Sequence, residues 1–154
     1  MSGKCGLIPH LVVNGGVKAV EFYTAALGAE EILRMPTPDG RLMHASLKIG
    51  DAVLMLCDDF PEHCGGVSRA PKGPSPVTLH LNVESADAAI AKAAAAGATV
   101  TMPATDMFWG DRYGQIVDPF GHSWSFSNPL TAEQKAEAEK KWAEMHECGE
   151  KAVA

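Results

Sequence analysis

"HLVVNGGVKAVEFYTAALGAE", residues 10–30, returns in altered form as "HLNVESADAAIAKAAAAGAT", residues 80–99. Both stretches read H-L-x-V, then a short turn, then an amphipathic segment that ends at a glycine. This pattern is typical of a strand that leads into a helix. Each helix is predicted to end at its glycine, Gly28 or Gly97, because glycine adopts the left-handed conformation at little cost. The similarity indicates a duplicated structural unit.

The segments that follow the two predicted helices are also alike. Three strand-like runs separated by turn signals come after each glycine, the first set at 29–59 and the second at 98–127. The chain therefore reads β-α-β-β-β twice, which predicts an α+β fold of two tandem modules. The modules are expected at 7–60 and 77–128, joined by a Gly- and Pro-rich linker at 61–76, and together they form one domain, 1–128.

Residues 129–154 are predicted to form an amphipathic C-terminal helix and a tail. Thr131 and Gln134 have the spacing of a capping box, in which each side chain bonds the backbone of the other residue. Ala138, Trp142 and Met145 then fall on one face of the helix. This apolar stripe is expected to pack on the protein's own sheet or on a partner subunit.

Composition excludes several classes of function. The chain has 154 residues, 46% of them hydrophobic, which suffices for a folded core. Its net charge is −6 and it lacks a basic cluster, so neither nucleic acid nor an anionic membrane is an expected partner. No targeting segment is recognisable, and the four cysteines (Cys5, Cys57, Cys64 and Cys148) lack paired spacing and read as reduced thiols. A cytoplasmic protein is expected.

Three motifs carry a resemblance to a known family: "VEFYTAALGAE" (20–30), "LMHASLKIGDAVLML" (42–56) and "FWGDRYGQIVDPFGHSWS" (108–125). Together with the repeat, they resemble the vicinal oxygen chelate superfamily of glyoxalase I, bleomycin-resistance proteins and extradiol dioxygenases. More narrowly, they resemble its PhnB-like branch. The resemblance covers residues 7–128. It implies a mixed sheet that curls around a cavity, a small-molecule ligand there, and a homodimer.

In the metal-dependent members, the ligands come from the first and fourth strands of each module. His10 matches the first ligand position. Met55, Thr78 and Ser125 stand at the other three, where the resemblance implies carboxylate or histidine ligands. Methionine and serine supply no negative charge to a divalent ion. No metal cofactor is therefore favoured.

One alternative metal site stays open at this point. His80 lies two residues beyond Thr78 and so faces the same side of its strand, while Cys57 shares a face with Met55. His10, His80 and Cys57 would offer two nitrogens and one sulfur to zinc, nickel, iron or manganese.

The loop that enters the third strand of the second module adds aromatic candidates for the pocket. Trp109 and Tyr113 are predicted either to form a stacking wall at the mouth of a cavity or to belong to an ordered loop. Arg112 is either free to meet an anionic group or paired locally with Asp111. The candidate pocket residues are His10, Met55, Thr78, His80, Trp109, Arg112, Tyr113 and Ser125.

The last strand of the second module should have two different faces. Trp124 and Phe126 are expected beneath the helix layer, and Ser123, Ser125 and Ser127 on the side of the cavity.

The leading functional hypothesis is a protein that binds a small organic ligand without a metal, either as a binding protein or as a metal-independent enzyme. One alternative is a metal-dependent lyase or dioxygenase that uses His10 and His80. Another is an antibiotic-sequestering resistance protein. The sequence identifies neither catalytic residues nor the ligand.

Overall fold

The computed structural model describes residues 6–150, with side-chain surroundings as far as residue 146. The described part contains eight strands, three α-helices and a short 3₁₀ helix. In chain order they are β1 (His10–Val13), α1 (Gly16–Leu27), β2 (Glu30–Pro36), β3 (Leu42–Ile49), β4 (Ala52–Asp58), η1 (Pro61–His63), β5 (Thr78–Asn82), α2 (Ala86–Ala95), β6 (Thr99–Asp106), β7 (Asp111–Val117), β8 (Ser123–Pro129) and α3 (Ala132–Glu150).

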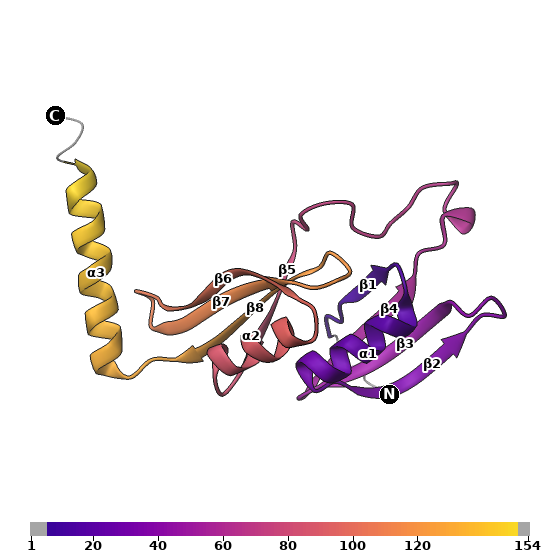
Figure 1. Cartoon of the computed structure of the whole chain (residues 1–154), viewed down its shortest axis with the longest axis horizontal. Helices are drawn as coiled ribbons and strands as arrows, with labels where there is room; N and C mark the ends of the chain where they lie inside the picture. The colour runs from indigo at the N-terminus through magenta and orange to yellow at the C-terminus, as the bar shows by residue number, and fades with distance from the viewer. Residues whose placement is uncertain (1–5, 151–154) are drawn as a thin grey trace.

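The strands form two four-stranded mixed sheets. Sheet A has the order β1-β4-β3-β2 and sheet B the order β5-β8-β7-β6. In both sheets the first pair is parallel and the other two are antiparallel. The predicted α+β fold with two β-α-β-β-β modules and a C-terminal helix is confirmed. Within one chain the two sheets remain separate and form no closed barrel (Figure 1).

The two modules meet through their helices and a shared core. α1 packs on sheet A, α2 packs on sheet B, and the two helices contact each other (Figure 1). The fully buried Tyr23 of α1 donates its hydroxyl to Asp118 Oδ2 at 2.6 Å, and the indole N–H of Trp124 donates to the same oxygen at 2.9 Å. The ring of Phe120 lies 6.1 Å from that of Tyr23. One residue of α1 therefore joins the cores of both modules.

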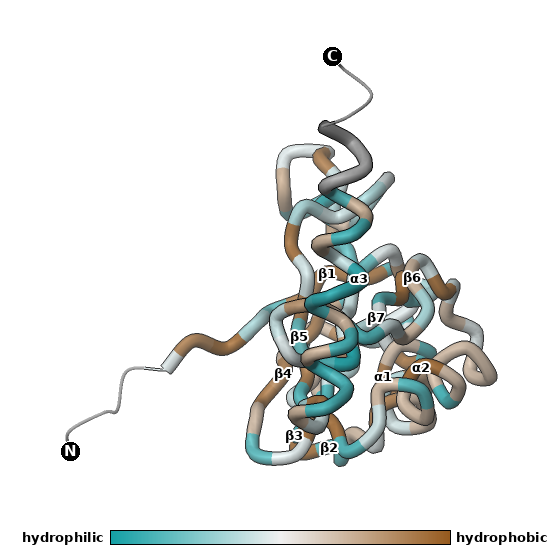
Figure 2. Tube along the Cα trace, turned by 90° about the vertical axis from the view of Figure 1, so that its left-hand side faces the viewer, coloured by the Kyte–Doolittle hydropathy of each residue, from teal (hydrophilic) through white to brown (hydrophobic). Residues whose placement is uncertain are grey.

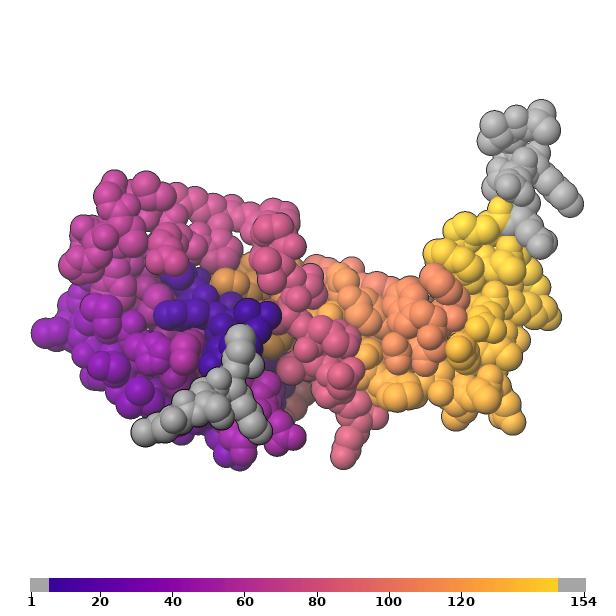
Figure 3. All heavy atoms as spheres, turned by 180° about the vertical axis from the view of Figure 1, so that it is seen from behind, coloured from indigo at the N-terminus to yellow at the C-terminus, as the bar shows by residue number. Residues whose placement is uncertain are grey.

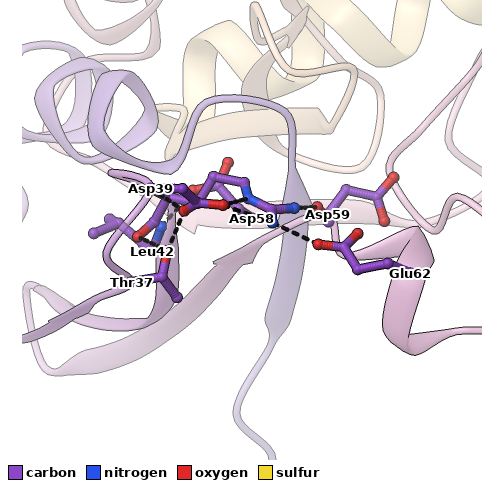
Figure 4. A network of polar contacts seen from close by, with 7 residues as sticks. Thr37, Asp39, Leu42, Asp58, Asp59 and Glu62 are labelled. Carbon is purple, nitrogen blue, oxygen red and sulfur yellow. Dashed lines mark hydrogen bonds and ion pairs between the residues drawn. The ribbon is translucent and has the colours of Figure 1, made fainter.

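Helix α1 takes its N-terminal cap from a distant strand. The Asp58 carboxylate at the end of β4 accepts the backbone N–H groups of Gly15 and Gly16 at 2.9 Å each. It also accepts the backbone N–H of Leu42 at 2.6 Å (Figure 4). The helix ends as predicted at Gly28, which has a φ of 66°. The cap fixes α1, β3 and β4 to one another.

Strand register gives each sheet one face that packs on its helix and one face that α1 and α2 leave uncovered, here called the open face. The open face of sheet A carries His10, Val12, Glu30, Leu33, Met35, His44, Ser46, Lys48, Val53, Met55 and Cys57. The open face of sheet B carries Thr78, His80, Asn82, Tyr113, Gln115, Ser123, Ser125 and Ser127. As predicted, Trp124 and Phe126 lie on the helix side, where they are 2% and 1% exposed.

The molecule is elongated, with α3 at the end farthest from sheet A (Figures 1 and 3). The predicted capping box is present, since Thr131 N–H donates to Gln134 Oε1 at 3.0 Å and Gln134 N–H donates to Thr131 Oγ1 at 3.2 Å. The segment before β1 projects from the body, with Leu7 98% exposed (Figure 2). None of the helices in the described part of the chain is long and apolar enough to cross a membrane.

Candidate functional site

The open face of sheet B centres on a histidine held by two serines. Ser125 Oγ lies 2.8 Å from His80 Nδ1, and Ser127 Oγ lies 3.2 Å from His80 Nε2. Both serines are buried, at 2% and 4% exposure, whereas His80 is exposed. Ser127 also donates to Asn82 Oδ1 at 3.4 Å, which fits a His80 tautomer that carries its proton on Nε2. The strand places these groups together because residues two apart share a face.

A row of aromatic rings starts at this histidine. The rings of His80 and Tyr113 stack with their centroids 6.0 Å apart, and Trp109 meets Tyr113 edge to face at 5.7 Å. The row continues through Phe108, at 5.2 Å from Trp109, to Trp142 of α3, whose ring stacks on Phe108 at 4.2 Å. The apolar stripe of α3 therefore packs, at Trp142, on its own module.

The open face of sheet A carries a second pair of histidines. The rings of His10 and His44 lie 5.6 Å apart, and His44 Nε2 lies 2.9 Å from Ser46 Oγ. Burial lowers the pKa of His10, and the nearby His44 and Arg69 lower it further. His10 is therefore in a place that disfavours its own positive charge.

Two cysteines lie near the end of this face. Cys57 and Cys64 are free thiols that line a pocket of about 410 Å³ together with Val12 and Arg69. Burial raises the pKa of Cys57, which keeps it in the neutral thiol form. Cys5 and the side chain of Cys148 lie outside the described residues.

The structure contradicts the interpretation of Arg112 as a free anion-binding group. Its guanidinium donates to both carboxylate oxygens of Asp87 on α2 and to Asp106 at 2.7 Å. Local pairing with Asp111 is not the arrangement either. Arg112 and Tyr113 are neighbours on β7, so their side chains lie on opposite faces of the sheet. The Arg112 side chain therefore lies on the helix side of sheet B, where Asp87 of α2 pairs with it.

The donor set does not fit a divalent metal site of the type implied by the resemblance. Both ring nitrogens of His80 are within hydrogen-bond distance of serine hydroxyls. Over the described residues, no three His, Cys, Asp or Glu side chains are grouped so that they could hold a metal ion. The alternative set is also not assembled in one chain, since His10, His80 and Cys57 each line a different pocket.

The structure thus distributes the predicted pocket residues over two open faces. His10 and Met55 lie side by side on sheet A, where their Cα positions are paired. Thr78, His80, Tyr113 and Ser125 lie on sheet B, with Trp109 against Tyr113.

Sequence reasoning missed Gln115, which donates its side-chain N–H to the Tyr113 hydroxyl at 2.8 Å. Its spacing of two residues from Tyr113 is the signal that would have found it. It also missed Arg69, which lines the pocket at the end of sheet A but lies in the linker, where no strand pattern marks it.

The sequence model of the Glyoxalase/Bleomycin resistance protein/Dioxygenase superfamily matches residues 7–126. The chain belongs to this superfamily. An uncharacterized protein of Mycobacterium tuberculosis is 49% identical over 126 residues, which span 80% of this chain and 74% of that protein. An uncharacterized protein of Arabidopsis thaliana is 32% identical over 121 residues, or 73% of this chain and 71% of that protein.

Solved structures support the same fold. The X-ray structure of an Arabidopsis thaliana gene product aligns with a TM-score of 0.67 at 29% identity, covering 82% of this chain and 100% of that one. A Pseudomonas aeruginosa protein gives a TM-score of 0.67 at 27% identity, covering 83% and 100%. A fosfomycin resistance protein of Listeria monocytogenes is 16% identical with a TM-score of 0.62, covering 86% and 98%, which is a likeness of fold alone.

The open face of sheet B offers stacking, hydrogen bonding and little charge. His80 and Tyr113 present ring surfaces, and Gln115 presents an amide beside them. Flat aromatic surfaces bordered by a few polar groups are typical of sites for planar organic molecules.

Proposed function

We propose that this protein binds a small planar organic ligand against the open face of sheet B, without a divalent metal. The observation that carries the proposal is the row of His80, Tyr113 and Trp109, whose rings stand in contact on a face that α1 and α2 leave uncovered. Trp109 is 45% exposed, so ring surface remains available to a ligand. The motifs quoted above support a place in the PhnB-like branch.

The polar groups around the rings suggest how the ligand is oriented. Ser125 and Ser127 hold the imidazole of His80, and this contact limits its rotation. Gln115, bonded to the Tyr113 hydroxyl, retains an amide oxygen that can accept a hydrogen bond from a ligand. A planar molecule with one or two polar substituents fits this surface best.

A second copy of the chain completes the site in this proposal. The open face of sheet A exposes Leu33 and Met35 by 47% and 50%. Exposed apolar side chains gathered on one sheet face are typical of a surface that another protein covers. A homodimer that brings sheet A of one protomer against sheet B of its partner would enclose the ligand between two open faces.

The ligand proposal is tested with 2-naphthol, a planar phenol without charge. Isothermal titration calorimetry should detect saturable binding of 2-naphthol and much weaker binding of cyclohexanol, which lacks a ring that can stack. Tyr113→Ala removes one stacking contact worth about 0.5–1.5 kcal/mol, so it should weaken the binding of 2-naphthol about two- to tenfold.

Val100→Ala, on the helix side of the neighbouring strand β6, is the control and should bind like the unmodified protein. Equal affinity of the unmodified protein and Tyr113→Ala would show that the ring row is not the binding surface.

A further inference from the structure

A groove of about 440 Å³ lies where the two modules of one chain meet. The first module contributes the turn between β3 and β4 and the start of β4, together with the segment before β1. The second module contributes the β5 residues 78–81 and Trp124 of β8. The groove is therefore lined by both modules.

The groove follows one edge of sheet B. β5 is the edge strand of this sheet, next to β8. Because side chains alternate along a strand, Thr78 and His80 belong to the open face of β5, and Leu79 and Leu81 to its helix side. All four line the groove. The groove therefore passes around the edge of β5 and reaches the open face of sheet B.

The walls of the groove are mostly aliphatic. Ile49, Val53, Leu79 and Leu81 all line it, and each is half-buried, so that part of every side chain remains in contact with water. Covering such surface is favourable in proportion to the apolar area that is removed from water. The volume of the groove lies in the ordinary range of ligand pockets.

Only one side chain that lines the groove carries a fixed charge. This is Asp51, in the exposed turn between β3 and β4. Within residues 6–146, its carboxylate belongs to none of the ion pairs. An anionic group in the groove would be repelled by this carboxylate. The lining therefore fits an uncharged aliphatic group.

His80 belongs both to the groove and to the ring row of the proposed site. Its imidazole lines the groove and stacks on Tyr113 with the ring centroids 6.0 Å apart. Since β8 lies between β5 and β7, the ring row extends from His80 across the sheet, and the groove extends from His80 around the sheet edge. A planar ring bound at His80 can therefore carry a substituent into the groove.

We propose that the groove holds an unbranched alkyl arm of the ligand whose planar ring lies on the ring row. The inference deepens the proposed function and rests on it, because one ligand occupies both surfaces. It gives the class of ligand as an aromatic compound with an uncharged alkyl substituent.

The test compares 2-naphthol with 6-hexyl-2-naphthol by isothermal titration calorimetry on the full chain. The quantity measured is the ratio of the two affinities in each protein. A fully buried methylene group strengthens binding about fourfold. A hexyl arm that is buried to about half should therefore make 6-hexyl-2-naphthol bind about 50-fold more tightly than 2-naphthol.

Ala52→Glu places a carboxylate in the groove at an exposed position, so that the fold is not disturbed. It should reduce the ratio to about fivefold or less, because the arm would then lie against a charged group. Ala25→Glu is the matched control, since it adds the same side chain to the exposed side of α1, away from the groove. It should keep the ratio of the unmodified protein.

Two results would overturn the inference alone. They are saturable binding of 2-naphthol with no gain from the hexyl arm, and an equal gain in Ala52→Glu and Ala25→Glu. The ring row is tested separately by Tyr113→Ala. If Ala52→Glu removes the gain but Tyr113→Ala binds both compounds like the unmodified protein, the groove stands and the ring row is rejected.

Discussion

At the residue scale, hydrogen bonding decides which chemistry each polar side chain retains. His80 has a serine hydroxyl at each ring nitrogen, so its remaining capacity is the flat face of the ring. The guanidinium of Arg112 donates its hydrogen bonds to Asp87 and Asp106. The chemistry that each side chain retains therefore depends on its neighbours.

Tyr23 gives the clearest test of a single buried bond. Its hydroxyl donates to the Asp118 carboxylate at 2.6 Å inside the shared core. Tyr23→Phe should lower the free energy of unfolding by about 1.5–3 kcal/mol, because a hydrogen bond to a charged acceptor is lost. Urea denaturation measures this change. Tyr113→Phe, whose hydroxyl only meets Gln115 on the open face, should cost about 0.5 kcal/mol or less.

Because of the same tyrosine, the free energy of unfolding should fall at alkaline pH. Burial, followed by the nearby Asp118 charge and its hydrogen bond, raises the pKa of Tyr23 well above the ordinary value of 10.0. Above pH about 10 the unfolded chain loses this proton while the folded protein keeps it, so stability falls as pH rises toward the folded pKa. Tyr23→Phe should flatten this part of the stability curve. An unchanged alkaline slope would contradict the assignment.

At the element scale, helix α1 depends on a carboxylate from another strand. Its N-cap residue, Gly15, offers no side chain, and Asp58 accepts the N–H groups of Gly15, Gly16 and Leu42 instead. Asp58→Ala leaves three buried or half-buried donors without a partner and should cost about 3–5 kcal/mol of unfolding free energy. Urea denaturation again measures it.

Asp51→Ala, in the exposed turn between β3 and β4, is the control and should change stability little. A similar small effect of Asp58→Ala would show that water or neighbouring groups replace the cap.

Most elements could be predicted from the sequence because their patterns are local. The repeat, the glycine at the end of α1 and the Thr131–Gln134 capping box all report on contacts between residues close in the chain. Strand alternation correctly separated Trp124 and Phe126 from the serines of β8. The same rule places Arg112 and Tyr113 on opposite faces, so the pocket role considered for Arg112 conflicted with a pattern that was readable in the sequence.

The rest could not be predicted because it depends on contacts across the chain. Asp87 meets Arg112 only once α2 has packed on sheet B. The resemblance implied a cavity. Whether the two open faces of one chain enclose that cavity together depends on how α1 and α2 pack against each other. Arg41 joins the start of β3 to the start of the linker through the Asp59 carbonyl and Glu62, a contact that no local pattern shows.

At the scale of the whole molecule, the two open faces predict self-association. Size-exclusion chromatography with light scattering should give about twice the chain mass of 16.3 kDa. Leu33→Asp places a charge on the open face of sheet A and should shift the protein toward the monomer. Ala25→Asp, on the exposed side of α1, is the matched control. A monomer at all concentrations would contradict the proposed dimer.

We propose that this member of the superfamily uses its open faces for an organic ligand rather than a divalent metal. The most direct measurement is elemental analysis of tag-free protein after incubation with zinc, nickel, manganese or ferrous iron and removal of unbound metal. Serine hydroxyls lie within hydrogen-bond distance of both ring nitrogens of His80, and no donor triad is assembled in the part of the chain that the structure describes. Retained metal should therefore stay far below one ion per chain. One tightly held ion per chain, lost in His10→Ala, would contradict the account.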